Sequence, residues 1–247
     1  MQVLQIDEMN DPIPYQVRVS PRARNIYLHM SLERGLEVVV PKNFPLHKIL
    51  ELIALRRDWI KRHHRRFEKY RNQQSQSPQP PQVLPDSIHF PAINQRWNVT
   101  YRQENLGRVI LRRTGSGTIE LHGDIENKEA CCVALRKWVL KEAKQAFDPW
   151  LRKISEETGL SYRSMQIRLQ RSRWGSCSPR KTISLNAKLL FLAPELVRYL
   201  FIHELCHLVQ MNHSPRYWAL VAVKEPNYKQ LDQALRNAMN EVPWWCR

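Results

Sequence analysis

Residues 203–213, HELCHLVQMNH, hold three of the nine histidines in the chain, with a glutamate directly after the first of them. His203 and His207 are four positions apart. On a helix, their rings would lie on one face about one turn apart and could bind one metal ion. Glu204 lies near the same face, where it can reach a metal-bound water without being a ligand. This HExxH spacing predicts two ligands and a general base for hydrolysis.

A hydrolytic zinc ion needs a third protein ligand and an open position for water. His213 is our candidate for that ligand, because it follows His207 by six residues and precedes Ser214-Pro215, a pair typical of a helix start. Glu225 is a rival, since some zinc hydrolases use a downstream glutamate. Two alternatives stay open at this point: a buried histidine pair can be structural, and His213 can be a capping residue.

The histidines need a helix and a neighbouring sheet to position them. The apolar pattern predicts a helix from Pro194 to about Met211 and a further helix over 214–225. Before them, two alternating segments predict strands over 164–170 and 182–189. The loop RSRWGSCSPRK (171–181) joins these strands, so we expect a hairpin beside the histidines. We expect the strand over 182–189 to offer its edge to an extended peptide.

The remaining segments alternate between strand and helix patterns. The sequence predicts a helix over about 127–157, which Pro149 could kink and which Gly159 should end. The other predicted strands lie over 15–20, 25–32, 35–41, 97–101, 108–113 and 118–123, and a basic helix is expected over 45–70. The proline- and glutamine-rich segment NQQSQSPQPPQ is typical of an extended linker. We therefore divide the chain into an N-terminal strand and helix region (1–71), a linker (72–82) and a larger domain (83–247).

Composition limits the class of protein. The formal net charge is +16, from 39 Lys and Arg against 23 Asp and Glu, which favours polyanionic partners such as nucleic acid or nucleotides. The five cysteines form no CxxC pair, which argues against a disulfide framework and a thiolate zinc site. We find no secretory signal pattern and no apolar run that could span a membrane. These features predict a cytoplasmic protein.

Four motifs in the last third of the chain resemble one family. They are RWGSCS (173–178), ISLNAKLLFLAP (183–194), HELCHL (203–208) and NHSPRYW (212–218). Together they resemble the YgjP-like metallopeptidase family, a zincin-like group also described as SprT-like. The similarity extends over about residues 15–236 and is strongest in the last 75 or so. Two departures are Ala187-Lys188, where the family has bulkier or basic residues, and the linker, which looks like an insertion.

The resemblance implies an α+β, zincin-like fold. In such a fold a small antiparallel sheet packs on helices that include the HExxH helix, and here an N-terminal β-rich segment precedes it. It also implies Zn²⁺ on His203, His207 and His213, with Glu204 as the acid and base. We add Arg173, Trp174 and Asn186 as substrate-binding candidates, because they lie in or beside the basic loop that precedes the histidine helix.

Three functions follow from these features, and the first is preferred. A zinc metallopeptidase would act on peptides or proteins through a water activated by the metal and by Glu204. A metal-dependent nucleoside triphosphate (UTP) pyrophosphatase would use the same water, with the basic loop stabilising phosphate charge. A nucleic-acid-associated, SprT-like protein is the third, supported by the basic helix and the net charge. Glu204 argues against a purely structural metal site.

Overall fold

The computed structural model describes residues 13, 15–21, 23–31, 35–65 and 83–247 of the chain. The chain divides into two compact units, residues 1–81 and 82–247, and each is described by itself. The predicted linker, 72–82, lies entirely outside the described residues, as does the end of the predicted basic helix. Each unit has its own cluster of buried apolar side chains, one within 13–60 and the other within 88–246.

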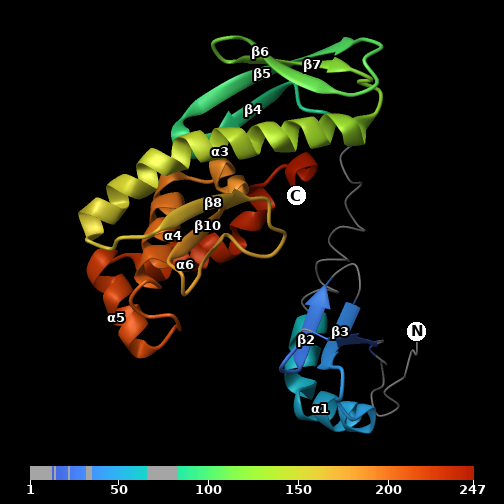
Figure 1. Cartoon of the computed structure of the whole chain (residues 1–247), viewed down its shortest axis with the longest axis vertical. Coiled ribbons are helices and arrows are strands. Elements are labelled where there is room, and N and C mark those ends of the chain that lie inside the picture. Colours follow the sequence, from blue (N-terminus) through green and yellow to red (C-terminus); the bar gives the residue numbers. More distant parts are fainter. Residues whose placement is uncertain (1–12, 14, 22, 32–34, 66–82) are drawn as a thin grey trace. The chain divides into compact units, whose positions relative to one another are not determined.

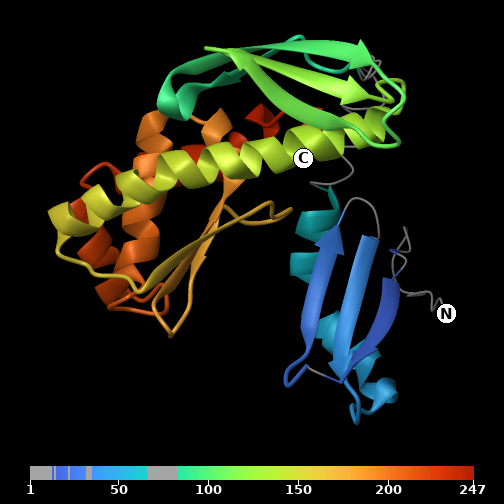
Figure 2. The same ribbon diagram turned by 45° about the horizontal axis from the view of Figure 1, so that its top comes forward.

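The first unit is a three-stranded sheet covered by helix. Its strands are β1 (Tyr15–Ser20), β2 (Tyr27–Ser31) and β3 (Gly35–Pro41), in the order β1-β3-β2 (Figure 2). β1 runs parallel to β3, and β2 runs antiparallel to it. Leu36, Val38 and Val40 alternate along β3, so they share one face of the sheet, and all three are buried in one cluster. The three predicted strands are confirmed.

The basic helix predicted over 45–70 is interrupted. A 3₁₀ turn, η1 (Leu46–Lys48), leads into α1 (Ile49–Leu55), and residues 57–65 are again helical. At Arg56 the backbone leaves helical geometry, and its N–H bonds to the carbonyl of Ile53, three residues back. Ile53 and Ile60, which lie seven positions apart on either side of the interruption, belong to one buried cluster.

The second unit contains a four-stranded sheet with the order β4-β5-β7-β6. Its strands are β4 (Ser87–Phe90), β5 (Gln95–Gln103), β6 (Ile110–Gly115) and β7 (Thr118–Gly123). β5 and β7 pair in parallel, and each outer strand pairs antiparallel with its neighbour. The alternation that predicted these strands buries Val99 and Ile119 on one face. The sequence prediction lacked β4, which is only four residues long.

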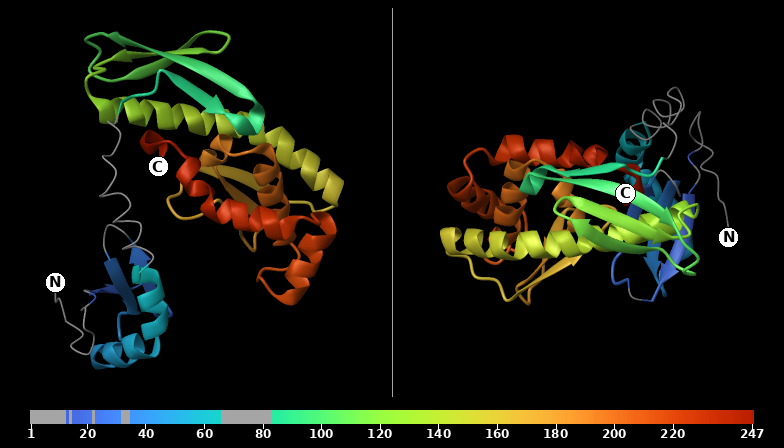
Figure 3. Two further views of the ribbon diagram at one scale, coloured as in Figure 1. Left: turned by 180° about the vertical axis from the view of Figure 1, so that it is seen from behind. Right: turned by 90° about the horizontal axis from the view of Figure 1, so that it is seen from above.

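Helix α3 (Lys128–Thr158) connects the layers of this unit. The four-stranded sheet lies along one side of α3, and the rest of the unit lies along the other (Figures 1 and 3). The Asn127 side chain caps its start by accepting the Ala130 N–H, and Gly159 ends it in the left-handed conformation, with φ of 70°. At 31 residues the helix is about 46 Å long. It runs on through Pro149.

A second, smaller sheet lies beside the histidine helix. It consists of β8 (Ser164–Arg168), β9 (Gly175–Cys177) and β10 (Thr182–Asn186), in the order β8-β10-β9. The predicted hairpin of 164–170 with 182–189 is wrong, because β8 and β10 run parallel. The loop between them contributes β9, which pairs antiparallel with β10 and so forms the real hairpin. The small sheet is therefore mixed rather than antiparallel.

Helices complete the unit around this sheet. They are α4 (Pro194–Cys206), α5 (Pro215–Lys224) and α6 (Tyr228–Asn237), and short 3₁₀ segments include η3 (Ala187–Phe191). Both α5 and α6 pack against α4. The α+β class is confirmed. No helix in the described part of the chain is both long and apolar enough to cross a membrane.

Candidate metal centre

The end of α4 and the start of α5 bring the three histidines together. His203 lies in the last turn of α4, His207 caps the helix, and His213 directly precedes Ser214, which caps α5. The helix ends earlier than the predicted boundary near Met211. After Cys206 the backbone tightens into turns, in which Leu208 and Val209 donate to carbonyls three residues back.

The three rings converge on one point. One ring nitrogen of each histidine lies within 4.8 Å of the other two. The Nε2 atoms of His203 and His213 are 3.2 Å apart. Two nitrogens bound to one tetrahedral zinc ion, at about 2.05 Å each, lie about 3.3 Å apart. The donor set, and the spacing of His203 and His213, therefore fit a zinc ion.

The environment favours the neutral form of His203 and His207, which is the form that binds a metal ion. Burial, and then the neighbouring His207 and His213, lower the pKa of His203 to about 3. Burial also lowers the pKa of His207. Glu225, the rival third ligand, is not part of the group, and its carboxylate instead accepts the backbone N–H of Asn227.

Aromatic side chains of α5 hold two of the rings. Tyr217 stacks on His207, with ring centroids 4.5 Å apart, and Trp218 stacks on His213 at 5.4 Å. The Nδ1 atom of His207 is 3.0 Å from the carbonyl oxygen of Gln210, so it donates its proton there and leaves Nε2 free. The aromatic pair belongs to the NHSPRYW motif, but its stacking on the histidines was not predicted.

Glu204 is buried beneath the strand β9. Its side chain is 4% exposed, and a Cβ placed on Gly175 would lie 2.5 Å from its Oε1 atom. Only glycine leaves room for the carboxylate at this position. Burial raises the pKa of Glu204 to about 8, against the opposing effect of the Arg173 guanidinium. Its Oε2 atom has no hydrogen-bond partner. A carboxyl group held near neutral pKa is suited to proton transfer.

The three substrate-binding candidates lie in the loop between β8 and β9 and at the end of β10. Asn186 has no exposed surface, and its amide donates to the carbonyls of Gln170 and Arg173. The indole N–H of Trp174 donates to the carbonyl of Leu235, which ties the loop to α6. These contacts give both side chains a structural role. Their binding of substrate stays a prediction, as does that of Arg173.

The strand predicted to offer its edge to a peptide is in fact central. β10 pairs on both sides, with β8 and with β9, so it has no free edge. The sheet's edge strands are β8 and β9. β9 carries Gly175, which contacts Glu204, and is therefore the edge strand that lies at the candidate centre.

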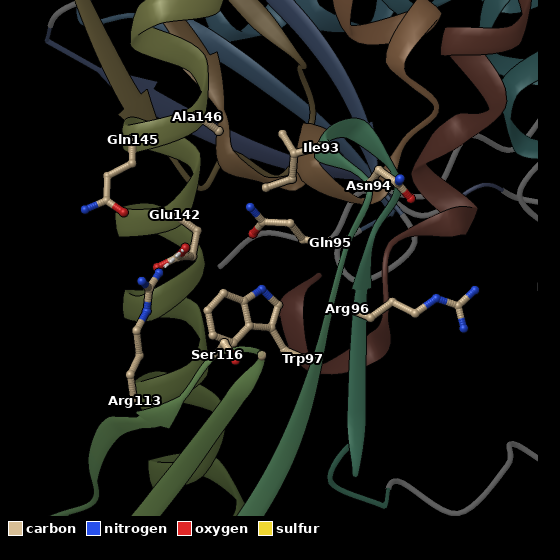
Figure 4. Close-up of a pocket in the computed structure, with 11 residues that line it drawn as sticks. Ile93, Asn94, Gln95, Arg96, Trp97, Arg113, Ser116, Glu142, Gln145 and Ala146 are labelled. Atoms are coloured by element: carbon tan, nitrogen blue, oxygen red, sulfur yellow. Dashed lines mark hydrogen bonds and ion pairs between the residues drawn. The ribbon is translucent and has the colours of Figure 1, made fainter.

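A separate hollow lies between α3 and the four-stranded sheet. It has a volume of about 590 Å³ and is lined by the start of β5, the turn between β6 and β7, and α3 (Figure 4). In it, Arg113 pairs with Glu142 at 2.5 Å and lies over the ring of Trp97, 4.7 Å from its centroid. None of the three histidines lines this hollow, and neither does Glu204.

Comparison with known proteins places the chain in a family. A family model described as the YgjP-like metallopeptidase domain matches residues 24–238. The chain belongs to the YgjP-like metallopeptidase family. The resemblance that the four motifs indicate is confirmed. This YgjP-like protein is therefore a metal-dependent hydrolase by family, and the histidine group is the place where the described residues can hold a metal ion.

Among solved structures, this YgjP-like chain is similar to the metallopeptidase zymogen of Pyrococcus abyssi abylysin. The similarity has 25% sequence identity and a TM-score of 0.33, and covers 36% of this chain and 91% of that chain. No curated protein matches the chain. The family match supports peptides or proteins as the substrate class and a divalent metal as cofactor.

Proposed function

We propose that this protein is a zinc metallopeptidase. His203, His207 and His213 bind the zinc ion, and Glu204 is the general base. The observation that supports this best is the convergence of three imidazole rings beside a buried carboxyl group whose pKa burial raises to about 8. When bound, zinc would polarise the scissile carbonyl and lower the pKa of a water molecule.

The protein's own groups perform the proton transfers. Glu204 accepts a proton from the attacking water and delivers it to the leaving nitrogen of the peptide bond. Burial raises its pKa toward neutrality, and a group with a pKa in that range can both take up and release a proton. Gly175 sets the position of the carboxylate, because any larger residue would occupy the space that the carboxylate fills.

An extended peptide can bind through main-chain hydrogen bonds to β9. This strand is at the edge of the small sheet, next to β10, and its Gly175 lies beside Glu204. Pairing of a substrate with β9 would bring its backbone along the histidine group, as in other cases of strand addition. We therefore assign to β9 the role that the sequence prediction gave to the strand over 182–189.

The test is hydrolysis of casein by the purified full chain, with zinc and after chelation. We expect activity with zinc, loss on chelation and recovery on readdition. Glu204→Gln should abolish hydrolysis while zinc stays bound, because the amide cannot accept the proton. His203→Ala should lose both zinc and hydrolysis. A Glu204→Gln variant with full activity would overturn the mechanism.

The same preparation tests the remaining alternatives. UTP and duplex DNA are offered in place of casein, and casein is also offered with DNA present. Hydrolysis of UTP without hydrolysis of casein would replace the peptidase proposal with the pyrophosphatase. Stimulation of casein hydrolysis by DNA would support the nucleic-acid-associated alternative. No observation in the described part of the chain favours either over the peptidase.

A further inference from the structure

Two residues from different helices stand behind the ring of His203. The hydroxyl of Tyr199, one turn earlier on α4, lies 3.4 Å from His203 Nδ1 and donates to Asp232 Oδ1 at 3.1 Å. Asp232 belongs to α6, which packs against α4 (Figure 1). Tyr199 is fully buried. The His203 ring is thus connected to a carboxylate on another helix through a single hydroxyl group.

The direction of each hydrogen bond follows from its partners. Arg236 donates to Asp232 Oδ2 through Nε at 2.8 Å and through Nη2 at 2.6 Å, so the carboxylate is held as an ion pair. An ionised carboxylate only accepts, so the proton of the Tyr199 hydroxyl points to Asp232. The lone pairs of the hydroxyl are then left to accept from His203. Burial, followed by Asp232, raises the pKa of Tyr199, which keeps the hydroxyl protonated.

This direction decides which nitrogen of His203 can bind a metal. If Nδ1 carries the proton that Tyr199 accepts, Nε2 carries the lone pair. Nε2 is also the atom 3.2 Å from His213 Nε2. His207 has the same tautomer, with the proton on Nδ1, because its Nδ1 donates directly to the carbonyl of Gln210. The rings of His203 and His207 are therefore oriented by different hydrogen-bond partners, a tyrosine hydroxyl and a backbone carbonyl.

We propose that Tyr199 and Asp232 are positioning residues that fix His203 in the tautomer with a free Nε2. The proposal rests on the proposed metal site. Through it, α6 contributes to metal affinity although none of its side chains is a ligand. Tyr199 transmits the effect of Asp232, so Asp232 should matter only while the Tyr199 hydroxyl is present.

The first measurement is zinc affinity of the full chain, by competition with a chromophoric chelator. Tyr199→Phe keeps the ring and removes the hydroxyl, and we expect it to weaken zinc binding about 10- to 100-fold, the usual effect of losing a ligand's hydrogen-bond partner. Tyr101→Phe is the matched comparison, because the Tyr101 hydroxyl also donates to an oxygen acceptor, the Pro85 carbonyl, but belongs to the four-stranded sheet. Equal weakening in both variants would overturn the proposal.

The second measurement separates the transmitted effect from simple packing. Asp232→Asn should weaken zinc binding in the wild-type background and cause no further weakening in the Tyr199→Phe background. Additive losses would mean that the two residues act independently and would overturn the proposal. The melting temperature of each metal-free variant reports any general loss of stability. If the two residues served only packing, stability would fall, but their effects on zinc affinity would not depend on each other.

The third measurement reads the tautomer directly. Long-range ¹⁵N–¹H correlation of the histidine rings in the metal-free protein should assign the proton of His203 to Nδ1, and Tyr199→Phe should shift it toward Nε2. An unchanged tautomer in the variant would count against the proposal. A different outcome would show that the proposed zinc site is wrong: the wild-type protein would bind no zinc, or His203→Ala would bind zinc with unchanged affinity.

Discussion

At the scale of single residues, the side chain of Glu204 packs closely against Gly175. The carboxyl group is buried, has an oxygen without a partner, and fills the space in front of a glycine. Burial of an unpaired carboxyl group costs folding free energy unless the group takes up a proton. The centre therefore has a measurable cost in stability, separate from its activity.

Glu204→Gln should stabilise the metal-free protein at pH 7 by about 1–3 kcal/mol. The folded pKa of about 8 lies above the ordinary value of 4.5. Stability from the protonated form is thus fully present below pH 4.5 and is lost as pH rises through 8. The gain from the substitution should vanish near pH 5. Urea unfolding in EDTA at several pH values measures it, and a gain that is independent of pH would contradict the assignment.

Gly175→Ala should reduce hydrolysis strongly while zinc stays bound. The added methyl group would meet Glu204 Oε1 at 2.5 Å and Cδ at 2.9 Å, so the carboxylate must move away from its position. Gly115→Ala is the control, since nothing lies within 4 Å of its Cβ position. Casein hydrolysis and zinc content of both variants are compared. Wild-type activity in Gly175→Ala would mean that the carboxylate position is not critical.

At the scale of elements, the long periodic segments were predictable and the short ones were not. Residues 128–158 repeat an apolar pattern over many turns between Asn127 and Gly159, so both ends of α3 could be predicted. β9 is only Gly-Ser-Cys, with no strand pattern of its own, and exists because β10 offers it a partner. Missing β9 led to the wrong hairpin and to the wrong edge strand.

In the proposed metal centre, contacts within one helix were also predictable from the sequence, and contacts between helices were not. The spacing of His203 and His207 is local to one helix, so the sequence alone brought the two rings together. Asp232 approaches His203 only through the packing of α6 on α4, which no spacing in the sequence reveals. The sequence could place Tyr199 next to His203, because it lies one turn earlier on the same helix. Its role depends on the hydrogen bond to Asp232, which the sequence does not reveal.

Asn186→Ala tests how the loop before β9 is held. Asn186 is fully buried and makes three hydrogen bonds, to the carbonyls of Gln170 and Arg173 and from the Lys188 N–H. Their loss should lower the free energy of unfolding by about 2–4 kcal/mol. Urea unfolding and casein kinetics distinguish the roles. Unchanged stability with a raised KM would instead support the predicted substrate-binding role.

At the scale of the whole molecule, all residues of the proposed centre belong to the second unit. The three histidines, Glu204 and the small sheet lie within residues 82–247, and the apolar cluster of that unit draws on no residue of the first. The unit therefore has the core and the ligands that an independent metal-binding domain requires.

A fragment of residues 82–247 should fold and bind one zinc ion with an affinity within about threefold of the full chain, as expected for sites without shared partners. Circular dichroism, cooperative unfolding and zinc titration measure this. His203→Ala in the fragment is the control for binding at other sites. An unfolded fragment, or one without zinc affinity, would mean that the first unit is needed to form the centre.

The stacking of Trp218 on His213 has an optical consequence. Trp218 also stacks on Tyr228, so its indole ring packs against two rings, one of which is the proposed ligand. Binding of paramagnetic Co²⁺ should quench the emission of this indole, whereas diamagnetic Zn²⁺ should not quench it in the same way. Trp218→Phe should abolish most of the quenching even though seven other tryptophans remain of the eight. The protein thus carries an intrinsic fluorophore that can report ion occupancy without a substrate.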